Sequence, residues 1–169
     1  MVYFDIDSFF TSSLMKLGKL PRNLVLIHPK GDEIDDAFMT LLSWTKPSFD
    51  LLVVDSATTF CHVFPIAKFS GKNRKLGFYL ALLRELAAKV SSPVLVTSHQ
   101  IFRKAGEDWS TAYSGGRVLD YHSGSALQAS LQEGSLYLEA KKGLVKGSVF
   151  GISTNQIAAI LEALYSQNR

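Results

Sequence analysis

Hydrophobic and polar positions follow two different periods along this chain. In the first two-thirds, short apolar runs at residues 2–4, 24–27, 51–54 and 93–96 alternate with segments in which apolar residues recur every three to four positions. The runs predict buried strands, and the segments predict amphipathic helices. Beyond residue 116 the period falls to two around Glu133-Gly134, which predicts a hairpin of residues 127–131 and 136–138.

The segments between the runs predict helices and two loops, the first of which lies just before residue 76. Asp7 or Ser8 is expected to cap a helix that runs toward Lys19, and Asp32 is expected to cap the next one. That second helix carries an apolar stripe of Ile34, Phe38, Leu41 and Leu42. A long helix is expected from Leu76 to Val90, a loop over residues 102–116, and a strand at 149–152. A last amphipathic helix is expected to carry Ile157, Ile160, Leu161 and Leu164.

This order of elements predicts the fold class. Alternating strands and helices followed by a meander are typical of a three-layer α/β fold, with a mostly parallel sheet and an antiparallel C-terminal extension. The chain has 169 residues, of which 47% are hydrophobic, so one core is expected to span a single domain over residues 1–169.

Composition says more about the cellular compartment of the protein than about its function. The formal net charge of +3 permits nucleic-acid binding without establishing it. Cys61 is the single cysteine, so no internal disulfide can form, and we expect a reducing intracellular compartment. The sequence holds no apolar run of the roughly 20 residues that a membrane span needs.

Acidic residues follow two of the predicted strands. Asp55 and Ser56 end the run at 51–54, while Asp5 and Asp7 end the run at 2–4. Parallel sheets bind ligands at the carboxyl ends of their strands, so these carboxylates are candidates for a metal site beside a nucleotide. The alternative is structural, with Asp55 capping a turn and Asp7 capping a helix.

The 169 residues contain no match to the phosphate-binding pattern G-x-x-x-x-G-K-[ST]. Without that nest of backbone N–H groups and its lysine, the β and γ phosphates of ATP have no cradle. We therefore expect no ATP hydrolysis by this chain alone. A Ser-His-Asp arrangement with a nucleophile elbow and the zinc spacings CxxC and HExxH are absent as well.

Basic residues gather in two of the predicted loops. The first loop holds Lys68, Phe69, Lys72, Arg74 and Lys75, and the second opens with Arg103 and Lys104. If both loops lie at one end of the sheet, they form a basic rim with an aromatic residue, which suits single-stranded DNA. The alternative is that both are ordinary solvated turns.

Taken in order, several segments resemble the RecA/RadA recombinase family, in particular a RadB-like paralogue of its archaeal and eukaryotic branch. The segment 2–7 (VYFDID) is similar to the strand after the phosphate-loop helix, and 51–56 (LLVVDS) to the Walker B strand. The segment 69–75 resembles the first DNA-binding loop, and 96–100 (VTSHQ) resembles the segment that opens the second. Gly115-Gly116 and 150–152 (FGI) match the glycine pair that closes the second loop and the final strand.

The resemblance implies roles for the candidate residues. Asp55, Ser56, Asp5 and Asp7 become a vestigial Walker B and metal site, and Gln100 joins the DNA-binding residues at the second loop. Asp108 lies near the position of an aspartate that caps the ATP of a neighbouring protomer. The family's first strand, phosphate loop and following helix have no counterpart here, so either later strands pair again across the gap or a partner fills it. Asp7 replaces the catalytic glutamate, and His99 replaces an asparagine.

The resemblance therefore implies a non-catalytic recombinase paralogue that acts in homologous recombination and DNA repair. It would bind a RadA-type recombinase or a paralogue, and single-stranded DNA, in the cytoplasm or in a nucleus. Val2 to Phe4 as an edge strand, together with Phe9 and Phe10, are the candidates for the partner surface. We expect no cofactor of its own, with ATP and Mg²⁺ present only if shared. The alternatives are half of a composite ATPase that supplies Asp108, and a KaiC-like structural adaptor.

Overall fold

The computed structural model describes residues 1–18, 21–44, 48–63, 69–106, 108–143, 146–153 and 155–156. They fall into two compact units, Met1–His122 and Ser123–Arg169. The predicted single domain over 1–169 stays a prediction, whereas each unit is compact by itself.

A four-stranded parallel sheet forms the centre of the first unit. Its order is β2 (Val25–Ile27), β1 (Val2–Asp5), β3 (Leu52–Asp55) and β4 (Val94–Val96). All three pairings are parallel, as the runs of apolar residues predicted. Among the described strands, β4 pairs only with β3, so no later strand closes the gap that the family resemblance implied.

The strand β1 lies inside the sheet, and the prediction that Val2 to Phe4 form an edge strand was wrong. β1 is hydrogen-bonded to β2 on one side and to β3 on the other. Val2 and Phe4 are 2% and 0% exposed, so neither side chain is available to a partner. The edge is β2, because the chain crosses over and places residues 25–27 outside β1.

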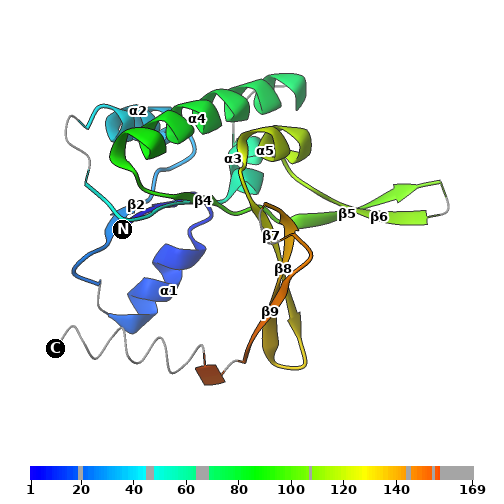
Figure 1. Ribbon diagram of the computed structural model, residues 1–169. Coiled ribbons are helices and arrows are strands. Elements are labelled where there is room, and N and C mark those ends of the chain that lie inside the picture. Colours follow the sequence, from blue (N-terminus) through cyan, green and yellow to red (C-terminus); the bar gives the residue numbers. More distant parts are fainter. Residues whose placement is uncertain are drawn as a thin grey trace. The chain divides into compact units, whose positions relative to one another are not determined.

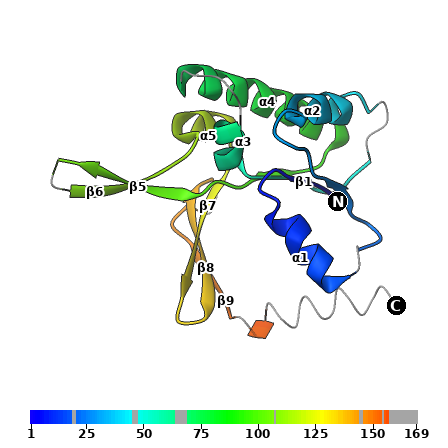
Figure 2. The ribbon, with the colours of Figure 1, turned by 180° about the vertical axis from the view of Figure 1, so that it is seen from behind.

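Helices cover both faces of this sheet (Figure 1). α2 (Ile34–Leu42) and α4 (Phe69–Val90) lie over one face, and α1 (Phe9–Leu17) lies over the other, which the view from behind also shows (Figure 2). α3 (Ala57–Val63) follows β3 directly, and α5 (Gly116–His122) packs on α4. The predicted three-layer arrangement is therefore confirmed.

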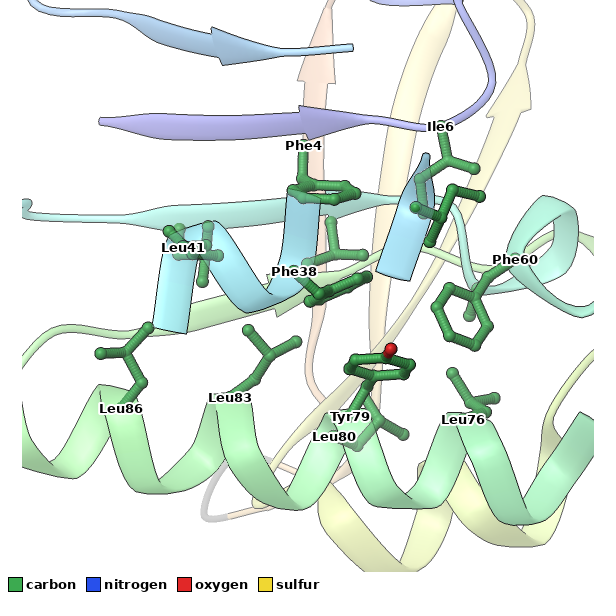
Figure 3. Packing of buried hydrophobic residues seen from close by; sticks show 14 of the residues in the cluster. Phe4, Ile6, Phe38, Leu41, Phe60, Leu76, Tyr79, Leu80, Leu83 and Leu86 are labelled. Carbon is green, nitrogen blue, oxygen red and sulfur yellow. The ribbon is translucent and has the colours of Figure 1, made fainter. Parts of the chain in front are cut away.

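The core lies between the sheet and the helices α2 and α4 (Figure 3). Ile34, Phe38 and Leu41 of α2 are buried, which confirms the predicted stripe. Phe38 stacks on Phe4 and Tyr79 with ring centroids 4.4 Å apart in both pairs. Asp32 does not cap this helix. Glu33 occupies the N-cap position, and its Oε2 accepts the N–H of Lys30 at 2.9 Å.

Two of the predicted loops are regular structure. α4 begins at Phe69, so Lys72, Arg74 and Lys75 lie on its first two turns rather than in a loop. Lysine, arginine and leucine favour helices, and the segment contains no proline, so Gly71 and Asn73 do not prevent the helix.

The region predicted as a second loop, residues 102–116, forms an antiparallel hairpin followed by α5. The hairpin consists of β5 (Gln100–Ala105) and β6 (Asp108–Tyr113), paired through six residues on each strand. Gly106 has a φ of 69° at the turn between them, a conformation that glycine adopts without steric cost.

The second unit contains a three-stranded antiparallel sheet of β7 (Ala126–Gln132), β8 (Ser135–Lys142) and β9 (Val149–Ser153). The predicted hairpin and the strand at 149–152 are confirmed. The predicted last helix with Ile157, Ile160, Leu161 and Leu164 lies outside the described residues. None of the helices in the described ranges has the length and apolar character that crossing a bilayer requires.

Candidate functional site

The acidic residues at the carboxyl edge of the parallel sheet lie on neighbouring strands. Asp5 of β1 and Asp55 of β3 are paired in register, and Asp7 follows two residues after Asp5. Both predicted strand ends therefore meet at one edge, where open α/β sheets bind ligands.

Asp55 is held by two hydroxyl groups rather than left free for a ligand. Its Oδ2 accepts a hydrogen bond from the hydroxyl of Tyr3 at 2.7 Å, and its Oδ1 accepts one from Thr97. Asp55 thus ties β1 to β4 across β3 and does not cap a turn. Ser56 is fully buried, and its Oγ accepts the N–H of Thr59 at 3.3 Å.

Asp5 serves the helix that follows it. Ser8 is the N-cap residue of α1 but makes no side-chain cap bond. Instead the Oδ2 of the fully buried Asp5 accepts the N–H of Thr11 at 2.6 Å, which satisfies a free N–H of the first turn. Asp5 therefore has the role in α1 that was expected of Asp7 or Ser8, and neither Asp55 nor Asp7 makes the cap that the structural alternative assigned to it.

The side chain of Asp7 is 2% exposed, and neither of its oxygens accepts a hydrogen bond from the described residues. The Nε2 of His99 lies 3.7 Å from its Oδ2. Across the described part of the chain, no three histidine, cysteine, aspartate or glutamate side chains are placed as metal ligands. Both oxygens of Asp55 and the Oδ2 of Asp5 accept hydrogen bonds, while the buried Oδ1 of Asp5 accepts none from the described residues, and the vestigial metal site stays a prediction.

Three tyrosines keep their protons more tightly in the folded chain. Burial and the hydrogen bond to Asp55 raise the pKa of Tyr3, and burial and a bond to Asp35 (2.5 Å) raise the pKa of Tyr79. The hydrogen bond to Asp120 and burial raise the pKa of Tyr113 to about 12.

We therefore expect alkaline pH to destabilise this protein. The unfolded chain releases these protons near pH 10, and the folded chain releases them only at higher pH, so the free energy of unfolding falls as pH rises above 10. Denaturant melts at pH 9, 10 and 11 measure the fall. Tyr3→Phe should make it shallower, whereas Tyr121→Phe, at an exposed position, should not. An equal slope in Tyr3→Phe would contradict the assignment.

The hairpin β5–β6 presents an aromatic and polar face. Cross-strand partners in an antiparallel pair share a face, and the register pairs Lys104 with Trp109, Phe102 with Thr111 and Gln100 with Tyr113. Each of these three levels therefore holds one aromatic side chain and one side chain that can donate hydrogen bonds. Phe102 and Trp109 are each 69% exposed, and Tyr113 is 36% exposed. We call these six residues the aromatic face.

The aromatic face includes four residues that the sequence interpretation missed, namely Phe102, Trp109, Thr111 and Tyr113. Gln100 and Lys104, predicted to bind DNA, belong to it, while Arg103 is paired with Ser110 and is not one of the six, and its role in DNA binding stays a prediction. The available signal was the alternation of aromatic and polar residues on both sides of Gly106. Its aromatic positions are exposed, so it does not resemble the strand of a core.

The other predicted DNA-binding residues lie on α4. Arg74 is exposed and Lys72 is half-buried, but the Nζ of Lys75 forms an ion pair of 2.5 Å with Asp35. Lys68 and the side chain of Phe69 lie outside the described residues. A role of these residues in DNA binding stays a prediction, weakened for Lys75 by its ion pair.

The remaining candidates occupy separate elements. Phe9 is exposed at the start of α1, whereas Phe10 stacks on Tyr3 with ring centroids 4.0 Å apart. Phe9 is thus the accessible member of the predicted partner surface. Asp108 is exposed and begins β6, opposite Ala105. Its role toward a partner's nucleotide stays a prediction.

This architecture is similar to that of a solved structure. The chain is similar to a crystal structure of the RadB recombinase, with a TM-score of 0.62, 18% sequence identity, and coverage of 89% of this chain and 73% of that chain. No family model and no curated protein matches the sequence. The fold is thus that of a RecA-like core, and at this identity the similarity concerns the fold.

Proposed function

We propose that this chain is an accessory protein of homologous recombination and DNA repair, and that it binds single-stranded DNA through the aromatic face of the β5–β6 hairpin. Three findings support the proposal. The fold is RecA-like and similar to that of the RadB recombinase, the order of segments along the chain resembles that family, and the hairpin presents aromatic and basic side chains together.

The aromatic face is the observation that carries the proposal. Successive levels of an antiparallel pair are about 7 Å apart, because two residues of a strand advance that far. Bases stacked in B-DNA are spaced by about 3.4 Å. One aromatic ring at each level therefore matches the bases of an extended single strand better than those of a duplex. Each base that stacks on a ring contributes about 1–3 kcal/mol without dependence on sequence.

Electrostatics add a second contribution. Lys104 lies on the same face as Trp109, where its ammonium group can neutralise a phosphate while a base stacks on the indole ring. Neutralising phosphates releases counterions, so the affinity of such a site falls as salt rises. Gln100 and Thr111 supply hydrogen-bonding groups at the other two levels.

We also propose that this chain alone does not hydrolyse ATP. The 169 residues lack the glycine and lysine pattern that cradles a triphosphate. In addition, both oxygens of Asp55 already accept hydrogen bonds, from Tyr3 and Thr97. Nucleotide turnover would therefore belong to a partner, which we propose to be a RadA-type recombinase or a paralogue.

The first test is binding of a fluorescein-labelled oligonucleotide, followed by fluorescence anisotropy. We expect a single-stranded oligo(dT) to bind more tightly than a duplex of equal length, and its affinity to decrease as KCl rises from 50 to 200 mM. Quenching of tryptophan fluorescence should accompany binding, because Trp109 lies on the aromatic face. Absence of binding at 50 mM KCl would remove the DNA-binding part of the proposal.

A further inference from the structure

A buried residue outside the β5–β6 hairpin contacts one root directly and the other through Ser98. Thr58, in the first turn of α3, is buried, and its Oγ1 accepts the backbone N–H of His99 at 2.9 Å. The same Oγ1 lies 3.3 Å from the Oγ of Ser98. Ser98 in turn donates to the carbonyl oxygen of Ser114 at 3.0 Å. His99 precedes β5 and Ser114 follows β6, so these contacts join the two ends of the hairpin.

The direction of every hydrogen bond in this chain of contacts is determined. A hydroxyl group has one hydrogen to donate. Because Ser98 donates its hydrogen to the carbonyl of Ser114, it can only accept from Thr58. Thr58 therefore donates to Ser98 and accepts from the N–H of His99. The order of donors is His99 N–H, Thr58 hydroxyl, Ser98 hydroxyl, and the final acceptor is Ser114.

Two further contacts fix the same region without involving Thr58. The imidazole of His99 lies 3.7 Å from the buried carboxylate of Asp7. At the other root, the hydroxyl of Tyr113 donates to the carboxylate of Asp120 in α5. These contacts act on one root each, whereas Ser98 joins the two roots through Ser114, and Thr58 joins Ser98 and His99 to α3.

We propose that Thr58 is a positioning residue that sets the direction of the hairpin, although it does not belong to the aromatic face. The proposal rests on the proposed function for its effect on DNA binding. A hairpin with both roots fixed loses less conformational entropy when it binds a ligand. The isosteric change Thr58→Val removes the hydroxyl and leaves the N–H of His99 without its acceptor, while the volume of the buried side chain is kept.

The test combines a direct measurement on the hairpin with a binding measurement. In a Trp44→Phe background, Trp109 is the remaining one of the two tryptophans, so its time-resolved anisotropy reports motion of the hairpin. We expect Thr58→Val to increase the amplitude of this motion and to weaken oligo(dT) binding about five- to tenfold. Thr58→Ser keeps the hydroxyl and should restore both values. Thr59→Val, at the next residue of α3, is the matched control and should change neither.

The outcomes separate this inference from the proposed function. If the wild-type chain binds no oligonucleotide, the proposed function fails, and the anisotropy of Trp109 still tests the role of Thr58. If the wild type binds and Thr58→Val leaves both anisotropy and affinity unchanged, the role of Thr58 is overturned and the function stands. Should Thr58→Val fail to fold, Ser98→Ala interrupts the same hydrogen bonds one step later and is expected to give the same two effects.

Discussion

Replacing Phe38 by alanine is expected to lower the free energy of unfolding by about 3–5 kcal/mol. Phe38 is 1% exposed and contacts three other rings, stacking on Phe4 and Tyr79 and meeting Phe60 edge to face at 5.8 Å. The substitution removes the ring at the centre of this cluster and leaves a cavity between the sheet and α4. Urea melts followed by circular dichroism measure the loss.

Phe78 provides the matched control, since it is an aromatic residue of α4 directly before Tyr79 and is 57% exposed. Phe78→Ala should change the free energy of unfolding by no more than about 0.5 kcal/mol. A loss in Phe38→Ala as small as that of the control would contradict the position of the core. The midpoint of thermal unfolding should fall by about 6–20 °C in Phe38→Ala.

The core was predictable from sequence because its pattern is local. Ile34, Phe38 and Leu41 recur at the spacing of one helical face, and the run at 51–54 is apolar without interruption. These periods depend only on the geometry of a helix and a strand, so the two elements could be predicted without knowledge of the remaining chain. The same holds for the hairpin around Glu133-Gly134.

The position of β1 was not predictable in the same way. Val2 to Phe4 carry the same apolar pattern whether they lie at the edge or inside the sheet. Their place is set by the crossover that brings residues 25–27 to the outer side of β1. Order within a sheet is a property of the whole topology, so the edge assigned to β1 belongs to β2.

The segment that begins α4 was predicted incorrectly. Lys72, Arg74 and Lys75 were assigned to a loop, although each favours a helix. In the structure Lys75 contacts Asp35 of α2 from the helix surface. A charged segment is thus compatible with a helix that exposes one side to solvent, and helix propensity was the better guide here.

Only part of the candidate site could be predicted from the sequence. Asp5 and Asp55 were identified at the correct sheet edge, yet their roles depend on Thr11, Tyr3 and Thr97, which contact them only in the folded chain. The aromatic face was missed because the side chains that alternate along its strands are exposed and not buried. Hydrophobic periodicity detects faces that pack against a core, whereas Phe102 and Trp109 are each 69% exposed.

Because the aromatic face is exposed, a substitution on it is expected to have a large effect on DNA binding. Trp109→Ala is expected to weaken binding of oligo(dT) by about 1–3 kcal/mol, which corresponds to roughly a fivefold to 150-fold increase in Kd. Phe102→Ala should have an effect of the same kind, since Phe102 occupies the next level of the aromatic face. Fluorescence anisotropy with labelled oligo(dT) at constant salt measures both.

The salt dependence of these variants separates stacking from charge. Trp109→Ala should reduce affinity without changing the slope of log Kd against log salt, because the indole ring contacts no counterion. Lys104→Ala should instead reduce that slope by about one. Tyr121→Ala removes an exposed aromatic residue from α5 in the same unit and should alter neither quantity. If Tyr121→Ala weakened binding as much as Trp109→Ala, contact with DNA would not be specific to the hairpin, and the register of β5 and β6 would lose its functional meaning.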